Sequence, residues 1–125
     1  MTVQHWDIDR IDREMREAIE KGAADAIKAD SGEENRRFIE TQKRYQTHQH
    51  AIMLDTFRMA NEEIPASATS QAAALMIVQL TSNLAKLYGP GFFDLLIAKM
   101  GDLSAGKDRV NSRCVNAAPI QGGRA

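Results

Sequence analysis

The segment from Ser70 to Tyr88 constrains the fold most, because as a helix it would be apolar around nearly its whole circumference. Its apolar residues are Ala72, Ala73, Ala74, Leu75, Met76, Ile77, Val78, Leu80, Leu84, Ala85 and Leu87. A helix of this kind is normally buried in a core or a membrane. Polar residues interrupt the run, which is shorter than the roughly 20 apolar residues of a transmembrane helix. We therefore expect a helix buried among other helices and no membrane span.

The first helix is expected over residues 7–29, where apolar side chains recur at steps of three and four. Its apolar stripe consists of Ile8, Ile11, Met15, Ile19, Ala23 and Ile27. Asp7 is the expected N-cap. Opposite charges four residues apart support the helix on its other faces. The pairs expected there are Asp9 with Arg13, Asp12 with Arg16, and Glu17 with Lys21.

A second helix is expected over residues 32–64, beginning with a capping box formed by Ser31 and Glu34. One apolar row follows a heptad spacing: Phe38, Tyr45, Ile52 and Met59. A second row occurs only in the C-terminal half: Met53, Phe57, Ala60 and Ile64. We therefore expect that half to be buried and the N-terminal half to be mostly solvated.

The length of this second helix leaves two arrangements open. About 32 helical residues span about 48 Å, whereas a compact chain of this size has a radius of gyration of only about 14 Å. Either the helix breaks near residues 47–50, or it projects and pairs with a second copy.

Proline and glycine mark the remaining boundaries. Pro65 ends the second helix, and the sequence Gly89-Pro90-Gly91 ends the third. A short fourth helix is expected over residues 92–100, and the periodicity is lost after residue 103. The expected fold is all-α: two longer amphipathic helices, one buried apolar helix and one short helix form a small bundle. Residues 1–103 make a single helical domain, and residues 104–125 form a loosely ordered tail.

Charge is distributed unevenly although the net charge is only −1. Residues 1–34 hold ten acidic and five basic side chains, whereas residues 35–60 hold two acidic and five basic ones. The basic face of the second helix consists of Arg36, Arg37, Lys43 and Arg44, extended by Tyr45 and His48. This face is a candidate for contact with phosphates or a partner. The alternative is that it neutralises the acidic first helix or is simply solvated.

The sequence contains no catalytic, cofactor or metal-binding motif that supports an enzyme. His48 and His50 lie two residues apart, so on a helix they point in different directions and do not share a metal ion. A structural or titrating role is favoured for both. One enzymatic alternative remains, in which a buried His48 lies near a carboxylate such as Asp55. The single cysteine, Cys114, forms no intramolecular disulfide, which favours a reducing, cytoplasmic setting.

The overlong second helix and the all-round apolar third helix favour a helical interaction module or small regulator. Helices of these lengths supply limited material to cover the third helix, so a second copy would complete its burial. The module is therefore expected to be a homo-oligomer, with a dimer favoured, that binds a protein partner. The alternative is a nucleic-acid-binding regulator that uses the basic face.

Overall fold

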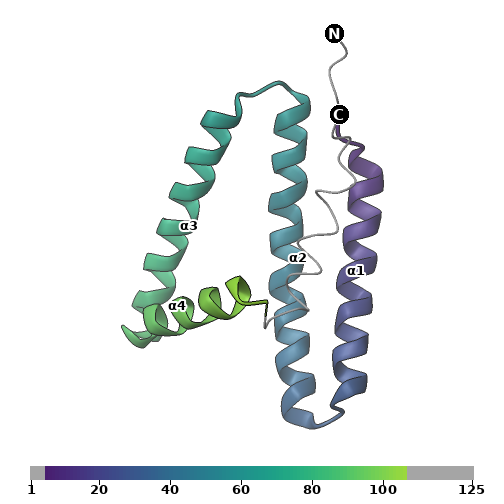
Figure 1. Ribbon diagram of the computed structural model, residues 1–125, viewed down its shortest axis with the longest axis vertical. Helices are drawn as coiled ribbons and strands as arrows, with labels where there is room; N and C mark the ends of the chain where they lie inside the picture. Colours follow the sequence, from purple (N-terminus) through teal and green to yellow (C-terminus); the bar gives the residue numbers. More distant parts are fainter. Residues whose placement is uncertain (1–4, 107–125) are drawn as a thin grey trace. The chain divides into compact units, whose positions relative to one another are not determined.

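All the secondary structure in the described part of the chain is helical (Figure 1). The computed structural model describes residues 5–106, so most of the predicted tail lies outside the described residues. The four helices are α1 (Ile8–Ala29), α2 (Glu33–Asn61), α3 (Ala66–Tyr88) and α4 (Gly91–Ser104). The prediction of an all-α fold with about four helices is confirmed. None of these helices combines the length and apolarity needed to cross a bilayer.

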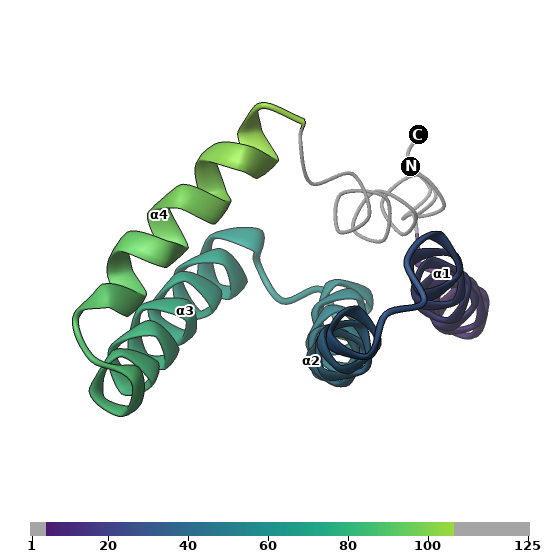
Figure 2. The same cartoon turned by 90° about the horizontal axis from the view of Figure 1, so that it is seen from below.

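The helices fall into two compact units, one containing α1 and α2 and the other, from Ile64 onward, containing α3 and α4. In the α1–α2 unit the two helices run antiparallel and side by side (Figures 1 and 2). In the α3–α4 unit, α3 and α4 contact one another. The single domain predicted for residues 1–103 stays a prediction.

Helix α1 begins and packs as its sequence pattern predicts. The side chain of Asp7 accepts a hydrogen bond of 3.1 Å from the backbone N–H of Arg10, which confirms the N-cap. The buried residues of the helix all belong to the predicted stripe: Ile11, Met15 and Ile19. Of the predicted ion pairs, Asp12 with Arg16 forms at 2.8 Å. Within the helix, Arg10 also pairs with Glu14 and Lys21 with Asp25.

The turn between α1 and α2 is closed by an asparagine rather than by the predicted capping box at Ser31. Helix α2 starts after Gly32 without a side-chain cap. The amide of Asn35 donates to the backbone oxygens of Ala26, at 3.2 Å, and Asp30, at 2.8 Å. Asn35 thus adds hydrogen bonds to carbonyl groups where α1 ends.

Helix α2 is continuous through residues 47–50, so the first of the two open arrangements, a break there, is wrong. Much of its length lies beside α1 (Figure 1). Its buried side chains are Ile39, His50, Leu54 and Phe57, most of them in the C-terminal half as predicted. Leu54 and Phe57 form a core with Ile11 and Met15 of α1, and Trp6, Ile8 and Met53 pack against it.

The predicted heptad row on α2 does not face α1. Phe38, Tyr45 and Ile52 are 59%, 58% and 42% exposed. A step of 100° per residue places this row about 150° around the helix from the buried set. The buried set keeps to one face of a straight helix better than a heptad row does. Ile39 and His50, for example, are 11 residues apart, which is close to three full turns.

The α3–α4 unit departs most from expectation. Helix α3 begins directly after Pro65 and ends at Gly89, whose φ of 91° is the left-handed value that glycine tolerates. Helix α4 extends beyond the predicted residues 92–100 to Ser104. No residue of α3 is buried. The prediction that α3 is buried is therefore wrong for the single chain, because α4 covers too little of its circumference.

Candidate functional site

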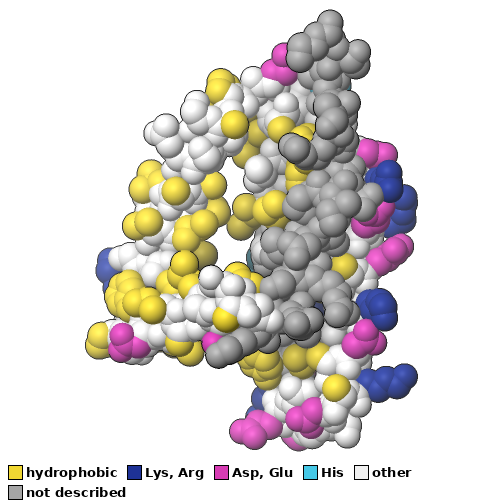
Figure 3. Space-filling model, viewed as in Figure 1, with side chains coloured by type: hydrophobic (Ala, Val, Ile, Leu, Met, Phe, Trp, Pro, Cys, Tyr) yellow, Lys and Arg dark blue, Asp and Glu magenta, His cyan; other side chains and the backbone are white. Residues whose placement is uncertain are grey.

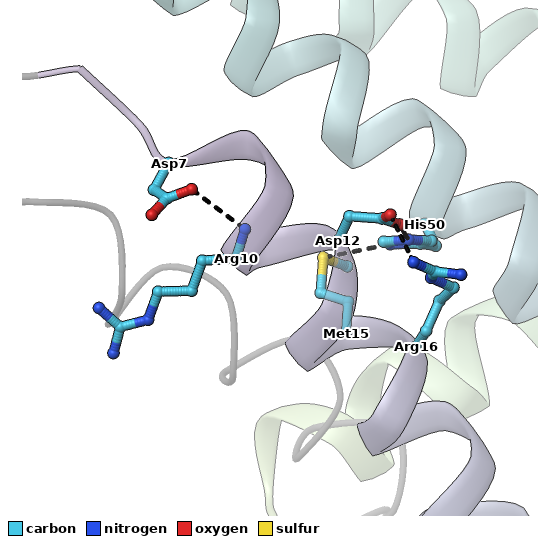
Figure 4. Close-up of polar contacts among 6 residues, drawn as sticks. All are labelled: Asp7, Arg10, Asp12, Met15, Arg16 and His50. Atoms are coloured by element: carbon cyan, nitrogen blue, oxygen red, sulfur yellow. Dashed lines mark hydrogen bonds and ion pairs between the residues drawn. The ribbon is translucent and has the colours of Figure 1, made fainter.

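A buried histidine joins the two helices of the α1–α2 unit (Figure 4). His50 on α2 is only 6% exposed. Its Nε2 lies 2.7 Å from Oδ1 of Asp12, and its Nδ1 lies 3.4 Å from Sδ of Met15. The other carboxylate oxygen of Asp12 binds Arg16 at 2.8 Å. These four residues form what we call the His50 cluster.

The His50 cluster has a clear electrostatic preference. Both partners of His50, a carboxylate and a thioether, are hydrogen-bond acceptors. The hydrogen bond from His50 lowers the pKa of Asp12, and the nearby charge of Arg16 lowers it further. Partial burial of the carboxylate acts in the opposite direction. Asp12 is therefore held as an anion between two donors.

The arrangement is structural and leaves no ring nitrogen of His50 open to a ligand. Asp12 and Met15 contact opposite nitrogens of the ring, so they do not converge on one point in space. Within residues 5–106, no group of three or more His, Cys, Asp or Glu side chains is arranged to hold a metal ion. The cluster therefore positions α1 against α2.

The enzymatic alternative, which placed a buried histidine at position 48, is not supported by the structure. His48 is exposed, and His50, two residues later, is buried. The partner of His50 is 38 residues away on α1, so no spacing within α2 reveals the contact. A second long-range contact was also missed: Asn61 accepts from the backbone N–H of Trp6 at 2.7 Å and donates to its carbonyl at 2.9 Å.

The predicted basic face lies on the surface of α2. Arg36, Arg37, Arg44, Tyr45 and His48 are exposed, and Lys43 is half-buried.

Two of its cations are bound to carboxylates. Lys43 forms an ion pair of 2.7 Å with Glu20 of α1, and Arg37 lies 3.6 Å from Glu33. These contacts support the alternative in which the basic face neutralises acidic side chains of α1 and of its own helix.

An open groove of about 950 Å³ is lined mostly by α1, with Thr47 and His50 from α2. Its charged lining residues have both signs: Arg13, Arg16, Lys21, Glu17 and Glu20, with His50 at one side. Because acids and bases are mixed here, the groove presents no field of one sign to a charged ligand.

The most extensive candidate site is apolar and lies on the α3–α4 unit (Figure 3). Its large side chains are between 36% and 73% exposed. We define this α3–α4 surface by Leu75, Met76, Ile77, Val78, Leu80, Leu87, Phe93, Leu95, Ile97, Met100 and Leu103. Exposed apolar residues in such number mark sites of protein or membrane interaction.

Comparison with known proteins finds no match: no family model fits the sequence, and no curated protein or solved structure is significantly similar. The contacts and exposed surfaces described above are therefore the basis for any functional assignment.

Proposed function

We propose that this chain is a helical interaction module that self-associates through the α3–α4 surface and acts by binding another protein. One observation carries the proposal: neither α3 nor α4 has a buried residue, although both are rich in large apolar side chains. The α1–α2 unit, by contrast, has its own small core. The apolar side chains of the α3–α4 unit thus require a partner for burial, whereas those of the α1–α2 core do not.

The magnitude of the exposed apolar surface favours association. Burying one large aliphatic or aromatic side chain contributes about 1.5–3 kcal/mol. Six such residues on each of two copies, each already about half-covered, would then contribute about 9–18 kcal/mol. Loss of translational and rotational freedom on association opposes this by about 4–15 kcal/mol. The apolar gain is therefore comparable with this cost or larger, which favours a dimer that dissociates on dilution.

Charge supports a protein partner over nucleic acid. The described α3–α4 unit carries Lys86, Lys99, Asp94 and Asp102, so its charges balance. The basic face of α2 has Lys43 and Arg37 already bound to carboxylates. Phosphate binding needs cations that are available to release counterions. The single cysteine of the chain supports a reducing, cytoplasmic setting for this activity.

Sedimentation velocity of the full chain over a range of micromolar concentrations tests the proposal. We expect a dimer that dissociates on dilution. The double variant Val78→Asp/Ile97→Asp should shift the equilibrium to monomer, because each aspartate would have to be desolvated in the interface. The matched control is Phe38→Asp, which alters an equally exposed apolar residue outside the α3–α4 surface. A parent chain that stays monomeric throughout would overturn the proposal.

A further inference from the structure

Within the α3–α4 surface, one row of residues on α3 has the spacing of a coiled-coil seam. Ala73, Met76, Leu80, Asn83 and Leu87 follow one another at steps of three and four, as the a and d positions of a heptad do. Met76, Leu80 and Leu87 are 36%, 51% and 73% exposed, and Asn83 is also exposed. We call this row the α3 seam.

The half-buried residues near the end of α3 lie on a different face. Thr81, Leu84 and Ala85 are partly covered close to the turn where α4 begins. At 100° per residue this face is about 110° from the α3 seam. The seam is therefore open in the single chain from Met76 to Leu87, whereas Ala73 is half-buried.

The α3 seam has no charged residue and one asparagine, and both features favour an identical helix as the partner that packs on it. Lys86 is the only charged residue in α3 and lies outside the seam. A partner with a charged surface would lose hydration there without gaining a counter-charge. Asn83 is the one strongly polar residue of the seam, and its amide carries both donors and an acceptor. An identical asparagine is therefore its natural complement.

We propose that a second copy of this chain docks its α3 in parallel on the α3 seam, with Asn83 opposite Asn83 of the partner subunit. This inference rests on the proposed self-association and names the helix and the register. In a parallel pair, d positions meet d positions, so the two amides hydrogen-bond to each other. An antiparallel pair would instead place Asn83 against an apolar a position and leave its amide buried without a partner.

The exposed heptad row of α2 is a poorer occupant for this seam. The positions between its apolar residues are Thr41, His48 and Asp55. Packing α3 against that row would bury the charge of Asp55 without a counter-charge on the seam. A membrane surface is also a poorer fit, because helices that bind membrane surfaces carry several cations on their polar face, and α3 has only Lys86.

Disulfide trapping of the full chain tests the register directly. Cys114 is first replaced by serine, and Asn83→Cys or Ser82→Cys is added separately. Both positions are exposed in the single chain. Only position 83 would meet its own copy, and a disulfide needs Cα atoms within about 7 Å. We expect mild oxidation to link most of the Asn83→Cys chain as a dimer and little of the Ser82→Cys control. Adding Leu80→Lys to the Asn83→Cys chain should abolish the cross-link.

The outcomes separate this inference from the proposed function. A dimer in sedimentation that fails to cross-link through position 83, or links equally through 82 and 83, overturns the parallel seam and leaves self-association standing. A monomer overturns both. Sedimentation with phosphatidylcholine vesicles tests for lipid binding. If the chain is monomeric and pellets with the vesicles, lipid rather than a second copy covers the α3 seam.

Discussion

Nε2 of His50 lies 2.7 Å from Oδ1 of Asp12, so a buried side chain of α2 makes a polar contact with α1. Buried polar pairs of this kind contribute less to stability than to the choice of one register between helices. Sliding either helix by one turn would separate His50 from both Asp12 and Met15. The contact therefore makes a single alignment of the α1–α2 unit preferable to its neighbours.

Replacing His50 with alanine should lower the free energy of unfolding by about 1.5–3 kcal/mol, the range for a hydrogen bond to a charged group. His50→Gln, which can still donate to Asp12, should lose less. Urea unfolding followed by circular dichroism measures both. The matched control is His48→Ala, two residues away on the same helix but exposed. An equal loss in the His48 variant would contradict the structural role of His50.

The lowered pKa of Asp12 predicts a specific dependence of stability on pH. Because the folded state holds this pKa below the ordinary value of about 3.8, the ionised carboxylate stabilises the fold above that value. The stabilisation disappears as the pH falls through the lower, folded-state pKa. The parent should thus exceed Asp12→Asn in stability near neutrality, and the two unfolding curves should converge in acid. A difference that stayed constant over this range would show that Asp12 does not titrate with folding.

Asn61 should be as sensitive as a core residue although it is only half-buried. Its two hydrogen bonds to the backbone of Trp6 hold the chain before α1 against the last residue of α2. At about 0.5–1.5 kcal/mol each, losing both in Asn61→Ala should lower the free energy of unfolding by about 1–3 kcal/mol. Asn61→Asp keeps the acceptor but loses the donor, so its loss should be intermediate. Thermal unfolding ranks the three chains, and a neutral alanine variant would refute the contact.

The ion pair of Lys43 and Glu20 should be weak and sensitive to salt. Exposed pairs contribute about 0.2–1 kcal/mol. In a double-mutant cycle, Lys43→Glu should lose stability and Glu20→Lys should restore it, with less coupling at high salt. Arg36→Glu, about two turns nearer the start of α2, is the control and should show no coupling to Glu20.

The double variant Lys43→Glu/Arg44→Glu tests whether the basic face of α2 binds nucleic acid. If the basic face only neutralises nearby carboxylates, neither the parent nor this variant should change the anisotropy of labelled DNA or RNA at physiological salt. Tight, salt-dependent binding by the parent that the variant loses would favour the nucleic-acid alternative instead.

The sequence predicted best what depends on a few neighbouring residues. Asp7 caps α1, Pro65 separates α2 from α3, and Gly89 ends α3 in the left-handed conformation, all as expected from local chemistry. The stripe of α1 was also predicted correctly, because it has only one apolar face. In each case one physical preference acts without competition from distant parts of the chain.

The predictions from sequence failed in two situations. In one, a helix had two apolar faces, either of which could be buried; in the other, the contact joined residues far apart in the chain. Helix α2 has an exposed heptad row and a buried set with a three-turn spacing, and periodicity alone favoured the row that contains Phe38 and Tyr45. Only the presence of α1 decides between the faces. The roles of His50 and Asn61 depend on partners that lie 38 and 55 residues away, so no local pattern reports them.

The packing of Trp6 against Phe57, with ring centroids 4.4 Å apart, has a practical consequence. Trp6 is the only tryptophan of the chain and lies in the α1–α2 unit. Its fluorescence therefore reports on that unit alone, whereas the backbone signal of circular dichroism comes from all four helices. Dilution that dissociates the α3 helices should leave the Trp6 signal unaltered, whereas loss of the α1–α2 core should change it. The chain thus carries an intrinsic optical probe that distinguishes loss of its core from loss of its partner.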